Sequence, residues 1–88
     1  MITRDVTIAS AVGLHARPAA LFVQAVTRAG VSIKISKEGR NPADARSLLA
    51  VMALGAKHGE TVTLTTDDDD AAPVLDELVE LLSTDLDA

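Results

Sequence analysis

The chain contains no cysteine, tryptophan or tyrosine, and only one phenylalanine. Without cysteine, neither disulfide bonds nor thiolate chemistry is available. With a single aromatic residue, the core has to be built mainly from alanine, valine and leucine. No apolar run is long enough to span a membrane, and the first residues lack the basic start and apolar stretch of a signal peptide. These absences predict a cytoplasmic protein without a membrane partner.

Basic residues are also scarce, with 8 Lys and Arg against 13 Asp and Glu and a net charge of −5. This balance argues against a nucleic-acid partner, because phosphate backbones attract basic surfaces. Two histidines without any cysteine are too few for a convincing metal site. The acidic run 67–70 lacks the glycine and the distal glutamate of a calcium loop and is typical of a solvated loop. We therefore expect no metal and no other cofactor.

The length of 88 residues and the largely apolar composition predict one domain over residues 1–88. Alternating polar and apolar residues predict strands over 3–9, 31–37 and 60–66. Helical spacing predicts helices over 16–29, 45–54 and 71–83, the second capped by Asp44. A very short strand within 38–43 would be confined to a sheet edge by Pro42. This order favours an α+β fold of two layers, an antiparallel sheet covered on one side by helices.

His15 lies where a glycine-containing loop becomes the first predicted helix. Backbone N–H groups of a first helical turn, here those of Ala16 and Arg17, lack helical partners and form an anion site. The positive helix end disfavours a charged imidazole, so we expect His15 to be neutral and nucleophilic. Arg17 adds a forked set of donors for phosphate oxygens. This combination suits a transferable phosphoryl group, although a histidine at a helix start is also common as a cap or surface residue.

The segment Gly13-Leu14-His15-Ala16-Arg17-Pro18-Ala19 resembles the active-site motif of HPr, the phosphocarrier of the bacterial phosphoenolpyruvate-dependent sugar phosphotransferase system. The segment Ala45-Arg46-Ser47-Leu48-Leu49-Ala50-Val51-Met52-Ala53-Leu54-Gly55-Ala56 is similar to the regulatory-site segment of that family. The two motifs have family-like spacing, and the resemblance covers essentially the whole sequence. It implies an open-faced sandwich of four antiparallel strands covered on one side by three helices.

The resemblance also implies a function. His15 would be phosphorylated on Nδ1 by enzyme I, which draws on phosphoenolpyruvate, and Arg17 would assist. The phosphoryl group would then pass to the IIA domain of a sugar permease. The sequence has no Walker-type glycine loop and no metal cluster that could activate a nucleotide. We therefore expect a stoichiometric carrier and not an enzyme.

A second modification site and a docking face are implied downstream. The resemblance implies that Ser47 is the residue phosphorylated by a regulatory serine kinase in some bacteria, although an early-helix serine also serves local hydrogen bonding. Exposed apolar residues beside the site predict a docking surface for enzyme I and IIA domains. Its expected members are Ala20, Leu21, Gln24, Leu48 and Met52. A small patch of this kind suits a monomer that releases each partner quickly.

Two other functions stay open at this point. One is a regulatory protein-binding module of the same fold that relays no phosphate, which the presence of His15 argues against. The other is a carrier for a nitrogen-related or dihydroxyacetone kinase system. The sequence also departs from the family pattern: Asp44 replaces a usual asparagine, Gln24 replaces a common basic residue, and the segment around Pro42 is one residue longer. His58 has no assigned role.

Overall fold

The structure is a computed structural model that describes residues 1–85. Within them the chain forms four strands and three helices, as the sequence and the family resemblance predict. Residues 86–88 of the predicted domain lie outside the described part. The elements follow one another as β1 (Ile2–Thr7), α1 (Ala16–Ala29), β2 (Lys34–Lys37), β3 (Ala43–Asp44), α2 (Leu48–Ala53), β4 (Thr61–Thr66) and α3 (Ala72–Leu82).

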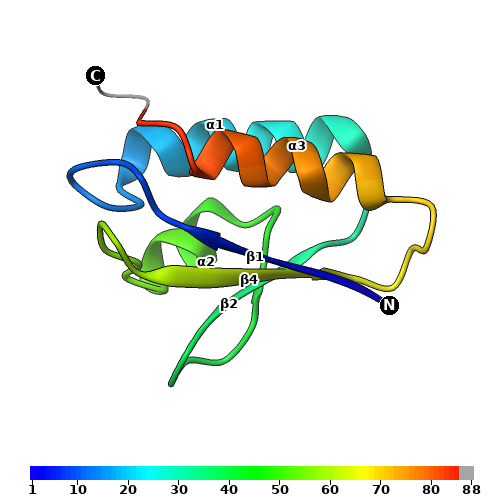
Figure 1. Ribbon diagram of the computed structural model, residues 1–88, viewed down its shortest axis with the longest axis horizontal. Helices are drawn as coiled ribbons and strands as arrows, with labels where there is room; N and C mark the ends of the chain where they lie inside the picture. The colour runs from blue at the N-terminus through cyan, green and yellow to red at the C-terminus, as the bar shows by residue number, and fades with distance from the viewer. Residues whose placement is uncertain (86–88) are drawn as a thin grey trace.

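The strands form one antiparallel sheet in the order β1-β4-β2-β3. Strands β1 and β4 pair along their whole length, from Ile2 opposite Thr66 to Thr7 opposite Thr61. The short strand β3 follows Pro42 and lies at the edge of the sheet, which confirms the expectation for this segment. Helices α1 and α3 run side by side over one face of the sheet (Figure 1). Across residues 1–85, no helix is long and apolar enough to cross a membrane.

The core lies between the sheet and the helices and is aliphatic apart from one ring. Phe22, the single aromatic residue of the chain, is completely buried on α1. The remaining core consists of alanines and of branched aliphatic side chains, which alternate along the strands and recur every three or four residues along the helices. The largest of those that are fully buried are Ile8, Val26, Ile33, Ile35, Val51, Val62, Leu64, Leu75 and Leu78.

The second helix begins later than the sequence predicts, at Leu48 instead of Ala45, and the prediction that Asp44 caps it is wrong. Asp44 is in β3, where it lies opposite Lys34, and the N–H of Ala45 donates to the carbonyl of Ile33 at 3.0 Å. The Asp44 carboxylate instead accepts the N–H of Arg46 at 2.9 Å, which closes a local turn. Pairing with β2 therefore delays the helix by about one turn.

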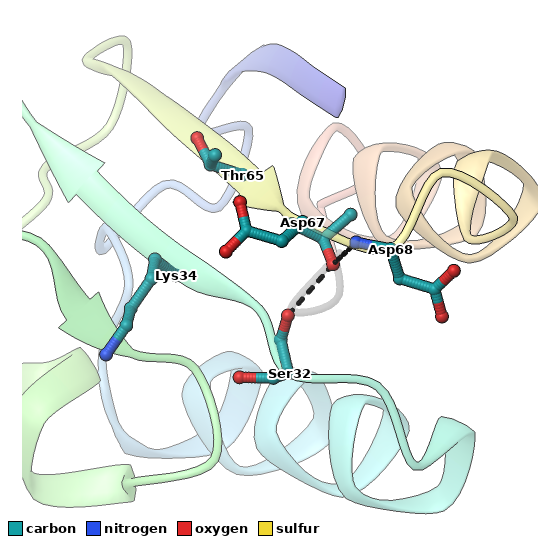
Figure 2. Close-up of a pocket in the computed structure, with 6 residues that line it drawn as sticks. Ser32, Lys34, Thr65, Asp67 and Asp68 are labelled. Atoms are coloured by element: carbon teal, nitrogen blue, oxygen red, sulfur yellow. Dashed lines mark hydrogen bonds between the residues drawn. The ribbon is translucent and has the colours of Figure 1, made fainter. Parts of the chain in front are cut away.

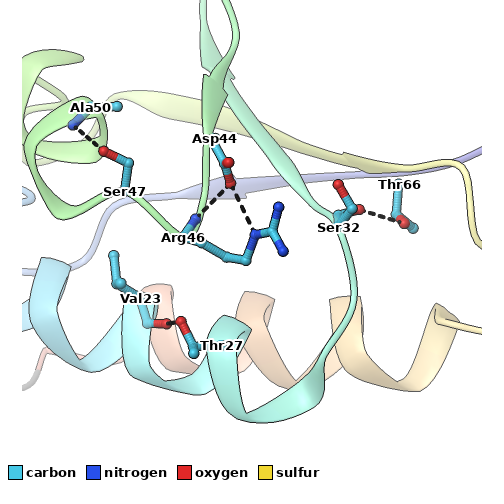
Figure 3. A network of polar contacts seen from close by, with 8 residues as sticks. All are labelled: Val23, Thr27, Ser32, Asp44, Arg46, Ser47, Ala50 and Thr66. Carbon is cyan, nitrogen blue, oxygen red and sulfur yellow. Dashed lines mark hydrogen bonds and ion pairs between the residues drawn. The ribbon is translucent and has the colours of Figure 1, made fainter.

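The predicted strand 31–37 is likewise shortened to Lys34–Lys37. Its alternation is real, because Ile33 and Ile35 are both fully buried. The carbonyl of Ser32, however, accepts a hydrogen bond from the hydroxyl of Thr66 at 2.9 Å (Figure 3). A side-chain donor at this position replaces a backbone partner from the ladder, so the regular strand begins at Lys34, three residues later than predicted.

Candidate functional site

His15 is the residue that immediately precedes α1, with extended backbone angles φ −84° and ψ −172°. Its carbonyl accepts the first helical hydrogen bond, from the N–H of Ala19 at 3.0 Å. Its side chain is half-buried and makes no capping hydrogen bond to the helix. His15 is therefore the N-cap residue of α1 by its backbone position, but its side chain makes no hydrogen bond that caps the helix.

The first turn of α1 has the features of an anion site. The N–H groups of Ala16 and Arg17 precede the first helical hydrogen bond, and Pro18 has no N–H to offer. The turn contains no acidic residue that could compete for these donors. Pro18 is buried, whereas Ala16 and Arg17 are exposed. An anion bound next to His15 would thus meet backbone donors, the positive end of a 14-residue helix and a guanidinium.

The loop that carries His15, residues 8–15, lies against the loop of residues 55–60; we call them the His15 loop and the platform loop. Both are at the same end of the sheet in Figure 1. The N–H of Ile8 donates to the carbonyl of Glu60, and the N–H of Gly59 donates to the carbonyl of Ile8, both at 2.9 Å. At the other end of the His15 loop, the N–H of Leu14 donates to the carbonyl of Ala56 at 2.8 Å.

Gly13 allows the close approach of these two loops. Its φ of +80° is a conformation that L side chains rarely adopt, and it is buried. A Cβ at this position would lie 2.7 Å from the carbonyl oxygen of Ala56 and 3.0 Å from the Cα of Lys57. Both are backbone atoms that cannot move aside alone. The glycine two residues before His15 is therefore required by conformation and by space.

Ser47 is the N-cap of α2 and does not lie in its first turn as predicted. Its Oγ accepts a hydrogen bond from the N–H of Ala50 at 3.2 Å (Figure 3). The residue is half-buried, and its own N–H donates to the carbonyl of Asp44 at 3.0 Å. Asp44 in turn holds Arg46, whose backbone N–H and then side chain lower the pKa of the Asp44 carboxyl. The serine hydroxyl thus completes the start of a six-residue helix.

The residues expected to form the docking face lie on α1 and α2, two helices in contact. Leu21, Leu48 and Met52 are each 39% exposed, Gln24 is exposed and Ala20 is half-buried. Two exposed aliphatic residues were not predicted: Leu49, at 82%, and Val12 in the His15 loop, at 72%. The late start of α2 explains the first, because Val51 and Leu54 turn inward and leave Leu49 on the outer side.

A separate hollow of about 300 Å³ lies at the opposite end of the sheet (Figure 2). Ser32, Lys34, Asp67 and Asp68 are among its lining residues, and the hydroxyl of Thr66 accepts the N–H of Asp68 at 3.2 Å. It is far from His15 along the sheet, because Thr66 pairs with Ile2 at the start of β1. In the described part of the chain, no three His, Cys, Asp or Glu residues gather in a way that could hold a metal ion.

Comparisons with known proteins show the family of the chain. A family model described as "PTS HPr component phosphorylation site" matches residues 2–84. The chain is 43% identical over 86 residues to the phosphocarrier protein HPr of Streptomyces coelicolor, covering 98% of this chain and 92% of the relative. The crystal structure of the phosphocarrier protein HPr from Bacillus anthracis superposes with a TM-score of 0.84, at 36% identity and 92% and 95% coverage. An HPr dimer from Thermoanaerobacter tengcongensis superposes with a TM-score of 0.67, at 37% identity and 86% coverage of both chains.

Proposed function

The chain belongs to the HPr family of phosphocarrier proteins, and on that premise we propose that His15 accepts a phosphoryl group from phospho-enzyme I and passes it to a IIA domain. The observation that carries this assignment is the place of His15 at the start of α1, beside the N–H groups of Ala16 and Arg17 that precede the first helical hydrogen bond. The role of a carrier for the phosphotransferase system follows from the family, whereas the acceptor residue and the partners are our proposal.

The proposed transfer is an attack of Nδ1 of His15 on phosphorus. A phosphorus–nitrogen bond forms to His15 while the bond between phosphorus and enzyme I breaks, and the reverse exchange delivers the group to the next carrier. The N–H groups of Ala16 and Arg17 would stabilise the phosphoryl oxygens, and the exposed guanidinium of Arg17 would add a charged, forked donor. The absence of acidic residues from this turn keeps the potential positive where the phosphoryl group arrives.

We assign docking of enzyme I and of the IIA domain to the exposed aliphatic residues of α1 and α2. Leu21, Leu48 and Met52 each expose 39% of their surface, and Leu49 exposes 82%. A patch of only a few aliphatic side chains supports recognition without slow release, as a carrier that serves two partners in turn requires. We further propose that the chain acts in the cytoplasm, as a stoichiometric carrier and not as an enzyme. The expected monomeric state stays a prediction.

Ser47 is the proposed acceptor for a regulatory serine kinase. Its support is the position of the hydroxyl at the start of α2, where phosphate oxygens could replace Oγ as acceptors of the Ala50 N–H. Phosphopeptide analysis of the source cells would test this assignment. Finding the peptide that contains Ser47 only in its unmodified form, under several carbon sources, would contradict it.

The central experiment is incubation of the chain with phosphoenolpyruvate and a cognate enzyme I, followed by intact mass measurement at neutral and acidic pH. We expect one phosphate per chain, lost in acid, and none on His15→Ala. The matched control for stoichiometry is His58→Ala, which removes the other histidine and should still gain one phosphate once the reaction has run to completion. Arg17→Ala should slow the transfer and leave the unfolding midpoint unchanged. Unmodified wild-type chain beside an active enzyme I would refute the assignment.

Transfer to purified IIA domains separates the pathways that the sequence leaves open. We expect the phosphate of phospho-His15 to pass to a IIA domain of a sugar permease. Faster transfer to a nitrogen-related IIA protein or to a dihydroxyacetone kinase subunit would assign the chain to one of those systems instead. Binding to a regulatory protein without any uptake of phosphate would favour the protein-binding module.

A further inference from the structure

The imidazole of His58 joins the platform loop to the His15 loop. Its Nδ1 lies 3.1 Å from the carbonyl oxygen of Ser10, a residue 48 positions away and only 3% exposed. A carbonyl oxygen can only accept a hydrogen bond, so Nδ1 of His58 carries the proton and donates it. This nitrogen is therefore occupied in holding the loop.

We propose that His58 is a positioning residue for phosphoryl transfer, which holds the His15 loop in the shape that presents His15 to its partners. The inference rests on the proposed function, since it assumes that His15 is the acceptor. The contacts involved join His58 in the platform loop to Ser10 in the His15 loop, and Ser10 to Gly13 in the same loop.

The His58 ring contacts the His15 loop between its two ends, at the carbonyl of Ser10. This carbonyl accepts the N–H of Gly13 at 2.9 Å as well as the His58 ring, so both of its lone pairs are used. The Gly13 bond closes a tight turn within the loop, and the His58 bond ties that turn to the platform. Without His58 the turn could still close, but its middle would lose this tie to the rest of the molecule. His15 follows only two residues after the turn.

The platform loop is itself anchored to the sheet. Because of this anchor, a hydrogen bond from His58 can hold the His15 loop in place. The carboxylate of Glu60 accepts the N–H of Lys57 at 2.7 Å and pairs with the ammonium of Lys37 at 2.9 Å. The same ammonium donates to the carbonyl of Gly55 at 3.1 Å. Lys37 belongs to β2, so these contacts fix the platform loop, and with it His58, to the sheet.

Two variants with the same side-chain skeleton test the role. His58→Asn keeps an N–H donor as many bonds from the backbone as Nδ1, whereas His58→Leu has the same branched shape and no donor. Phosphoryl uptake from phospho-enzyme I is followed in a single turnover by intact mass. We expect His58→Leu to slow uptake about two- to tenfold, the change that loss of one hydrogen bond produces, and His58→Asn to restore most of it. Amide exchange at Gly13 should quicken in His58→Leu alone.

The unfolding midpoint of each variant shows how far the substitution destabilises the whole fold. If His58 positions the loop, the difference in uptake rate between the two variants should persist at 10 °C, well below their unfolding midpoints. Normal uptake by the wild-type chain and by both variants would overturn this inference and leave the proposed function intact. Equal slowing in His58→Asn and His58→Leu would also overturn it, because the donor would then be irrelevant. Absence of uptake by the wild-type chain would overturn the proposed function and this inference with it.

Discussion

Replacing Gly13 by alanine tests whether the His15 loop depends on its close approach to the platform loop. The new Cβ would lie 2.7 Å from the carbonyl oxygen of Ala56, a distance at which the two loops must separate. Separation breaks the hydrogen bond from the N–H of Leu14 to that same carbonyl, now 2.8 Å long. The substitution therefore acts on the backbone that leads directly into His15.

The expected loss of stability in Gly13→Ala has two parts, the unfavourable backbone conformation and the clash with Ala56. A substitution at a second glycine, Gly39, measures the first part alone. Gly39 has nearly the same φ, +81° against +80° for Gly13, but a Cβ there meets nothing within 4 Å. Gly39→Ala should therefore cost only the unfavourable backbone conformation, about 1 kcal/mol. Gly13→Ala adds the broken hydrogen bond, about 1 kcal/mol, and strain from the displaced loops. We expect a total of about 2–4 kcal/mol for Gly13→Ala.

Urea unfolding of the two variants and the wild-type chain measures both parts. The entropy lost from the unfolded chain on changing glycine to alanine is the same at both sites and cancels in the difference. Phosphoryl uptake should fall in Gly13→Ala and stay at the wild-type rate in Gly39→Ala. An equal free energy of unfolding for the two variants would refute the reasoning, because the contact with Ala56 would then carry no cost.

Three further predictions use the same unfolding measurement. Ser47→Ala should cost about 1 kcal/mol through loss of the N-cap; an unchanged midpoint would mean that α2 does not depend on it. The Lys37 ammonium, and then the N–H of Lys57, lower the pKa of the Glu60 carboxyl, so Glu60 stabilises the fold above its ordinary pKa. That contribution should disappear as the pH falls from about 5 through the lowered folded value, and Glu60→Gln should weaken this acid dependence. Leu49→Ala should change stability by less than about 0.5 kcal/mol, whereas a deletion in the buried core such as Leu75→Ala should cost about 2–5 kcal/mol.

The element order and the place of His15 could be predicted from the sequence because both depend on local patterns. Alternation marked β4, helical spacing marked α1 and α3, and the position of His15 before an apolar stripe marked the start of a helix. The start of α2 could not be predicted in the same way. Asp44 and Ser47 are both good capping residues, and the choice between them depends on the pairing of β3 with β2. That pairing joins residues separated by a turn whose shape the local sequence does not specify.

The role proposed for His58 was missed for a related reason. Its partner is a backbone carbonyl 48 residues away, and no residue type at position 10 is needed to supply a carbonyl. A sequence pattern is a pattern of side chains, whereas this contact depends on a backbone carbonyl and on the two loops lying next to each other. The glycine at position 13 was noticed as a loop residue, but the reason for it, the carbonyl of Ala56, also lies in the other loop.

A phosphocarrier has to satisfy two demands that oppose each other. Its acceptor must be open enough to meet two different partners, yet its orientation must be fixed before transfer, because ordering a flexible loop at that moment would cost entropy. In this chain the side chain of the proposed acceptor, His15, is only half-buried, while the backbone around it is held at Ile8, Ser10 and Leu14. The hydrogen-bonded backbone of the His15 loop thus fixes the orientation of His15, while its half-buried side chain stays accessible to partners. For this reason substitutions in the platform loop, which touch no phosphoryl group, should still change the rate of transfer.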